Sequence, residues 1–175
     1  MSRTPDYAAP ILGWRAWLVV RREEGPRLRS VVQPIVWEPR RELVSECLAH
    51  RRLVSFRRRR HSDEGGGPDA KCTCGIYAAS DAAVAGQYAF NRVLQHRDTE
   101  ASVLGLVSLW GRVLKCPNGW RAEFAYPSRL FVPTRADDPI AARWCEKLAF
   151  ALTDYGVPVE LVSHRGEGDF VHSLT

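Results

Sequence analysis

The chain has 175 residues, of which 45% are hydrophobic, and its formal net charge at pH 7 is +5. This length and apolar content predict a single domain over 11–163, with a flexible N-terminus (1–10) and a C-terminal tail (164–175). No apolar run is long enough to span a bilayer and the N-terminus lacks the apolar stretch of a secretory signal, so we expect a cytoplasmic protein with no membrane partner.

Two strands and a helix are predicted in the first quarter of the chain. Residues 11–22 and 27–37 are rich in β-branched and aromatic side chains, and the Gly-Pro pair between them indicates the turn of a hairpin. Pro34 should keep the second strand short or at an edge, because proline donates no ladder hydrogen bond. The apolar spacing over 38–53 predicts a helix.

A second helix and a long hairpin are predicted next. Ser80 and Asp81 can cap a helix that ends near Arg97. The stretch 101–133 alternates β-formers, with a turn at Asn118-Gly119 and glycines at 105 and 111 that suggest bends or bulges.

The last third reads as strand, helix, strand over 129–163. Asp138 and Pro139 begin a helix that Gly156 ends, and 157–163 returns as a strand. The fold class expected is α+β: a curled, mainly antiparallel sheet or partial barrel with about three packed helices and a structural zinc site.

An arginine-rich segment follows the first predicted helix. Residues 51–61 contain the run Arg57–Arg60, which leads into a glycine-rich stretch, and we expect a mobile loop over about 54–71. One interpretation is a solvated excursion. The alternative is a nucleic-acid-binding surface in which Arg57, Arg58, Arg59 and Arg60 contact phosphates.

The same region holds a set of residues typical of zinc ligands. In a reducing compartment five cysteines are better explained as free, buried, catalytic or metal-bound than as a disulfide frame. Structural zinc takes four ligands from thiolate and imidazole, and Cys47, Cys72 and Cys74 with His50 or His61 supply them. His61 is the preferred imidazole, because His50 lies one helical turn from Cys47.

The residues around these cysteines allow a metal site, but the cysteines also have a simpler explanation. Gly75, next to the last thiol, would let the backbone turn closely around an ion. Against it, Cys47 can be a small buried hydrophobe and the Cys-x-Cys pair two incidental thiols.

Several short motifs, taken together, resemble a family of small uncharacterised actinobacterial proteins. The resemblance covers most of 11–133 and rests on GWRAW, a serine after the hairpin turn (Ser30), W-x-P, Cys47 followed by a histidine, P-x3-C-x-C-G-I-Y-A, GLVSLWGRV and GWRAEFAYP. It implies no activity that can be carried to this chain.

Six tryptophans are many for one small domain. Most should lie in the core, but an aromatic pocket for a planar ligand is the alternative. Its predicted ligand-binding residues, with their polar anchors, are Trp37, Tyr77, Trp110, Arg112, Arg121 and Glu123.

Signals for catalysis are weaker. Cys116 or Cys145 could be combined with His96 or His164 as nucleophile and base, but no local spacing joins them. Neither a P-loop nor a G-x-G-x-x-G fingerprint occurs. The leading expectation is a non-enzymatic, zinc-stabilised module that binds a partner protein or a planar ligand, with nucleic-acid binding and a cysteine-nucleophile enzyme as alternatives.

Overall fold

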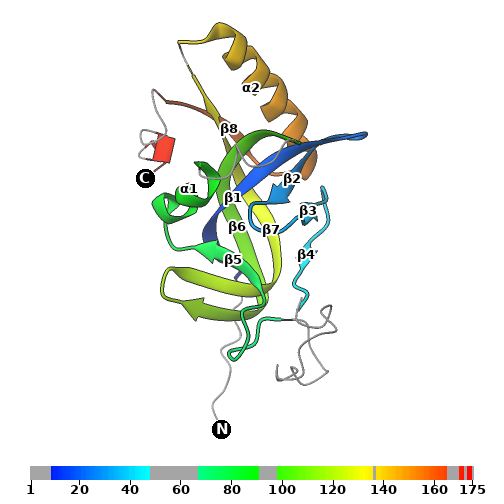
Figure 1. The fold of residues 1–175 in the computed structure, drawn as a ribbon, viewed down its shortest axis with the longest axis vertical. Coiled ribbons are helices and arrows are strands. Elements are labelled where there is room, and N and C mark those ends of the chain that lie inside the picture. The colour runs from blue at the N-terminus through cyan, green and yellow to red at the C-terminus, as the bar shows by residue number, and fades with distance from the viewer. Residues whose placement is uncertain are drawn as a thin grey trace.

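The computed structural model describes residues 9–47, 67–90, 98–135, 137–164, 170–171 and 173–174 (Figure 1). Within these residues one eight-stranded sheet is formed by β1 (Ile11–Arg22), β2 (Gly25–Ser30), β3 (Val36–Trp37), β4 (Leu43–Val44), β5 (Ile76–Ala79), β6 (Thr99–Cys116), β7 (Gly119–Thr134) and β8 (Val159–Ser163). The helices are α1 (Ala82–Phe90), α2 (Pro139–Leu152) and a short 3-10 helix, η3 (Thr153–Tyr155).

The expected α+β class is confirmed, but two of its details are wrong. The sheet is mainly antiparallel, as expected, with one parallel pair, but it is not a barrel, and the described residues contain two α-helices rather than about three. The parallel pair is formed by β7 and β8, which α2 connects. The predicted order of strand, helix and strand is therefore confirmed.

The first hairpin forms, but its turn lies at residues 23 and 24, and the predicted turn residues Gly25 and Pro26 instead begin β2. β1 pairs antiparallel with β2 from Trp17↔Ser30 to Arg22↔Gly25. The chain then bends through Pro34 before the two-residue strand β3 pairs with β2, which agrees with the expected effect of that proline.

The β6–β7 hairpin is the centre of the sheet. Cys116 pairs with Gly119, so Pro117 and Asn118 form the turn, one residue earlier than predicted. The pairing register shifts between Trp110 and Val113, next to the predicted bulge glycine at 111. The stretch 129–133, expected to be a separate short strand, is instead the end of β7.

The predicted helix over 38–53 is wrong in its described part, 38–47. Leu43 and Val44 form β4, which pairs with Ala125 and Phe124 of β7. The free edge of β7 offers backbone hydrogen bonds that an isolated helical turn cannot match, and the short apolar spacing alone does not separate helix from strand. Residues 48–53 lie outside the described part of the chain.

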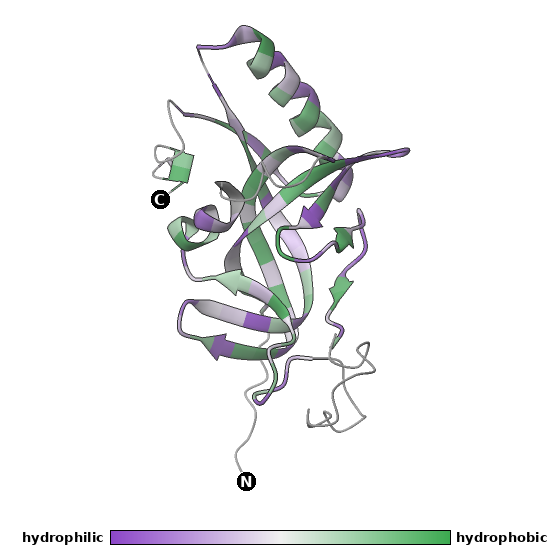
Figure 2. Cartoon of the chain, viewed as in Figure 1, coloured by the Kyte–Doolittle hydropathy of each residue, from purple (hydrophilic) through white to green (hydrophobic). Residues whose placement is uncertain are grey.

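Both faces of the sheet are covered, and this explains the run of five buried residues in β1. Trp17 and Val19 belong to a core cluster that includes Leu148 and Leu152 of α2, whereas Leu18 lies in a second cluster with Ala85 of α1 and Phe170. Figure 2 shows hydrophobic residues along the central strands and a hydrophilic tip on the β1–β2 hairpin. No helix in the described ranges is long and apolar enough to cross a membrane.

Candidate metal centre and the groove beside it

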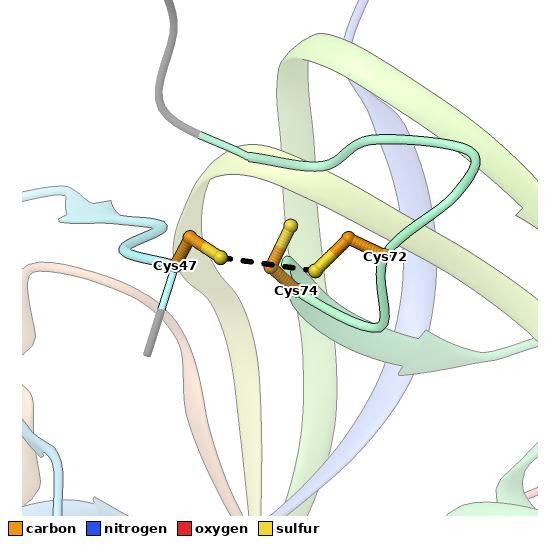
Figure 3. A group of neighbouring side chains, drawn as sticks. All are labelled: Cys47, Cys72 and Cys74. Carbon is orange, nitrogen blue, oxygen red and sulfur yellow. Dashed lines mark hydrogen bonds between the residues drawn. The ribbon is translucent and has the colours of Figure 1, made fainter. Parts of the chain in front are cut away.

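Three thiols converge at the end of β4 and the turn that leads into β5. The sulfur atoms of Cys47, Cys72 and Cys74 all lie within 4.8 Å of one another, and the Cys47 and Cys72 sulfurs are 3.7 Å apart. Figure 3 shows the three side chains directed toward a common point from two separate stretches of chain. These thiols can hold a metal ion.

Strand β4 carries Cys47 to this point. After β4, Ser45 continues the ladder by donating its backbone N–H to Glu123 O at 2.7 Å. Cys47 follows two residues later, as the antiparallel segment runs toward the start of β7. The same pairing with β7 that replaces the predicted helix therefore also sets the position of the first thiol.

The second and third thiols belong to a tight turn before β5. Asp69 folds this turn, because its side chain accepts from Lys71 N at 2.7 Å and its carbonyl from Cys72 N at 3.1 Å. The Arg121 guanidinium of β7 donates to the carbonyls of both Cys72 and Cys74. The backbone around both thiols is thus fixed from outside the turn.

Two glycines let the chain pass close to the thiols. Gly75 has φ +121°, a conformation that side chains with a Cβ rarely adopt, in keeping with the role expected for it. A Cβ on Gly67 would lie 2.7 Å from Cys74 Sγ and 2.9 Å from Ser45 Oγ. Position 67 therefore has no room for a side chain.

The electrostatics of the cluster favour a cation. Burial, and after it the neighbouring thiols of Cys72 and Cys47, raises the pKa of Cys74 to about 11. Three adjacent thiolates repel one another, so without a cation the protonated forms are favoured. A metal ion reverses this preference, because it binds thiolates and displaces their protons.

An open groove runs beside the thiols. Its volume is about 1130 Å³, and its walls come from β1, β5, α1, the β2–β3 bend and the thiol segments. Half of the large apolar side chains that the described residues expose gather on it: Val32, Ile35, Val44, Tyr77 and Tyr88. Trp14 and Trp120 add two more aromatic rings.

The predicted ligand-binding residues fall into separate places. Tyr77 lines the groove with 48% of its surface exposed, and Arg121 lies 5.9 Å from the Tyr77 ring. Trp37 is 1% exposed and packs edge-on against Trp17 in the core, so its ring faces no ligand.

The other three lie together at the bend of the β6–β7 hairpin, outside the groove lining. Trp110 stacks on Phe124 with ring centroids 6.1 Å apart. Arg112 donates its backbone N–H to the Glu123 carboxylate at 3.1 Å. The structure therefore brings Tyr77 and Arg121 together and does not place the set in one pocket.

Some predicted residues lie outside the described part of the chain. These are the candidate ligands His50 and His61, the phosphate-binding candidates Arg57–Arg60, and the candidate base His96. Of the two candidate nucleophiles, Cys145 is buried and donates to Pro133 O at 3.2 Å. Burial raises the pKa of this thiol, which disfavours the thiolate that a nucleophile requires.

Arg15 and Ser30 are functional candidates that the sequence pattern did not reveal. Arg15 lies in the middle of an apolar strand and lines the groove beside Ser30. Its signal in the sequence was a charged residue between two tryptophans of a predicted core strand, where charges are rarely buried without a partner.

Comparison with protein-family models, with curated proteins and with solved structures found no match to this chain. Its function is therefore inferred from the geometry of the site.

Proposed function

We propose that this chain is a zinc-stabilised binding module in which a structural zinc ion fixes one wall of the groove and the groove binds a planar ligand. Cys47, Cys72 and Cys74 are three of the zinc ligands. His61 is the predicted fourth ligand, with His50 the alternative.

The spacing of the thiols supports zinc. Zinc–sulfur bonds are about 2.3 Å, so two sulfurs of one tetrahedral site are separated by about 3.8 Å. The Cys47 and Cys72 sulfurs are 3.7 Å apart, whereas a disulfide would require about 2.05 Å. Three soft thiolates also favour zinc over magnesium or calcium, which prefer oxygen ligands.

The zinc ion has a structural role because the segment 43–47, which carries Cys47, has few other attachments to the sheet. In the described part of the chain it joins through the two residues of β4 and the Ser45 N–H. A bond from Cys47 through the ion to Cys72 and Cys74 would cross-link this segment to the turn before β5. Both sides of that cross-link line the groove.

One observation carries the binding function: the exposed apolar side chains gather on the groove that contains the thiols. Soluble proteins seldom expose a large apolar patch, and one that lies in a concave surface usually marks a binding site. Four aromatic rings along it, those of Trp14, Tyr77, Tyr88 and Trp120, suit a planar body.

Binding of 2-naphthamide, a neutral planar probe, tests this function. Because Trp14 and Trp120 line the groove, bound probe should quench tryptophan fluorescence saturably in the metal-loaded protein. Tyr88→Ala should weaken binding, since Tyr88 is 54% exposed on the groove. Phe150→Ala is the control, because Phe150 is 80% exposed but lies outside the groove lining. Absence of saturable binding, or equal effects of the two variants, would contradict the proposal.

A further inference from the structure

The groove contains one guanidinium that no carboxylate of the described residues neutralises. Arg15 lines the groove, and within the described ranges no acidic side chain lies at ion-pair distance from it. Glu46 also lines the groove, and no ion pair between Glu46 and Arg15 occurs among those found in the described residues. Burial lowers the pKa of Arg15 to about 10, so the group keeps its charge at neutral pH in a poorly solvated place.

The position of this guanidinium is set by its neighbours. Arg15 Nη2 donates to Ser30 Oγ at 3.1 Å, and its other terminal nitrogen donates to the Tyr77 carbonyl. The guanidinium carbon lies 5.0 Å from the centroid of the Trp37 ring, which in turn donates its Nε1–H to Ser30 Oγ at 2.9 Å. Trp37 and Ser30 thus form a support that holds Arg15 against the groove.

Much of the hydrogen-bonding capacity at this site is unused. A guanidinium has five N–H donors, and two nitrogens of Arg15 each make one bond while Nε has no partner among the described residues. Ser45 Oγ, also on the groove, is buried and likewise finds no partner within the described ranges. Buried polar groups are normally satisfied, so those left without partners on a groove point to a ligand that completes them.

From this geometry we propose that the groove binds a small amphipathic anion, a carboxylate or phosphate joined to a planar apolar body, with its acidic group on Arg15. This inference rests on the proposed binding function and specifies the ligand class. Arg15 supplies a fork that matches the two oxygens of a carboxylate or phosphate. Val32, Ile35 and Tyr88 provide the apolar surface for the rest of the ligand.

Three probes of one shape test the charge preference on the metal-loaded full chain. Naphthalene-2-carboxylate and 2-naphthyl phosphate carry the anion, and 2-naphthamide is their neutral counterpart. We expect the better anion to bind about ten- to a hundredfold more tightly than the amide, the ratio typical of hydrogen bonds to a charged group. Which anion binds more tightly decides between carboxylate and phosphate.

Variants at Arg15 assign the preference to this side chain. Arg15→Gln should abolish the difference between anion and amide while amide binding persists. Arg15→Lys should retain only part of it, because an ammonium has no planar fork. Arg22→Gln, the control, removes the same charge from the exposed end of β1 and should leave the preference unchanged. Circular dichroism of each variant verifies that it is folded.

The outcomes separate this inference from the proposed function. Equal binding of all three probes, or a preference that survives in Arg15→Gln, would overturn the anion site and leave the groove as a binding site for neutral ligands. No binding of any probe to the folded wild-type chain would overturn both. A preference lost in Arg22→Gln as strongly as in Arg15→Gln would show a general charge effect and also overturn the inference.

Discussion

The Sγ atoms of Cys47 and Cys72 lie 3.7 Å apart, although 25 residues separate them in the chain. The two thiols come from segments attached to the sheet separately, one through β4 and the other through the turn before β5. Their convergence with Cys74 links the metal proposal to the shape of the groove, because both segments are groove walls.

Replacing one thiol of the cluster should remove the metal. For Cys72→Ser we expect the zinc content to fall from about one ion per chain to near zero, and the melting temperature to fall with it, since a structural zinc contributes on the order of 10 kcal/mol to folding. Elemental analysis and thermal unfolding measure both effects. Cys116→Ser is the matched control, because Cys116 also lines the groove but is not in the cluster. Retention of full zinc content by Cys72→Ser would contradict the assignment.

The fourth ligand is tested by comparing the two histidines. We expect His61→Ala to weaken metal binding in a competition titration with a chromogenic chelator, while His50→Ala leaves the affinity unchanged. Cobalt substitution adds an independent reading, because loss of an imidazole alters the visible d–d bands while the thiolate-to-cobalt charge-transfer band persists. The reverse pattern would assign His50 instead, and no effect of either variant would remove histidine from the site.

A side chain at position 67 should disturb the metal centre. In Gly67→Ala the new Cβ would lie 2.7 Å from Cys74 Sγ, so either the thiol or the backbone must move. We expect a loss of about 1–3 kcal/mol in unfolding free energy, as for other overpacked sites, together with weaker metal binding.

The control for this substitution is Gly156→Ala. Gly156 has φ +70°, but a Cβ added there would meet nothing within 4 Å, so that variant carries only backbone strain. It should lose stability without any change in metal affinity. Equal metal affinity of Gly67→Ala and the wild type would show that the close approach at position 67 does not matter to the site.

The phenol of Tyr155 should matter for stability and for its pH dependence. Its oxygen accepts from Leu28 N at 2.8 Å and donates to Trp37 O at 2.5 Å, so it ties β2 and β3 to η3, the turn that follows α2. Tyr155→Phe removes both hydrogen bonds to these buried backbone groups, and we expect it to lower the unfolding free energy by about 1–3 kcal/mol. Denaturant unfolding measures this loss. Tyr88→Phe, on an exposed tyrosine, should change it little.

The burial of the Tyr155 phenol should also make the stability of the fold depend on alkaline pH. Burial raises the pKa of Tyr155, so the folded protein holds the phenol proton at pH values where the unfolded chain releases it. Stability should therefore fall as the pH rises above about 10, the ordinary tyrosine value. This decline should be smaller in Tyr155→Phe than in the wild type. An identical alkaline decline in both proteins would contradict the assignment.

Much of the fold was predictable because local signals and tertiary contacts agree. The hairpin of β1 and β2, the long β6–β7 hairpin and helix α2 each carry matching residue preferences, although both hairpin turns begin earlier in the chain than predicted. The error over 38–47 arose because the decisive partner of that segment, the edge of β7, lies about eighty residues away in the chain. No periodicity within a short segment contains that information.

Some residues of the candidate site were likewise predictable from the sequence, and others were not. Cys47, Cys72 and Cys74 were predictable because metal-binding chemistry restricts the residue types, whatever the backbone does between them. Trp37 could not be assigned from sequence, since only the structure shows its ring under Arg15 and inside the core. The role of Arg15 depends on which acids lie near it in space, and residue order does not show that.

The most direct test of the zinc-stabilised module is the metal content of the purified full chain, measured together with thermal unfolding before and after chelation. We predict about one zinc ion per chain and a marked fall in melting temperature when the ion is removed, as expected for a structural site. A chain that contains no metal at any stoichiometry, does not bind added zinc and melts at the same temperature with and without chelator would contradict it.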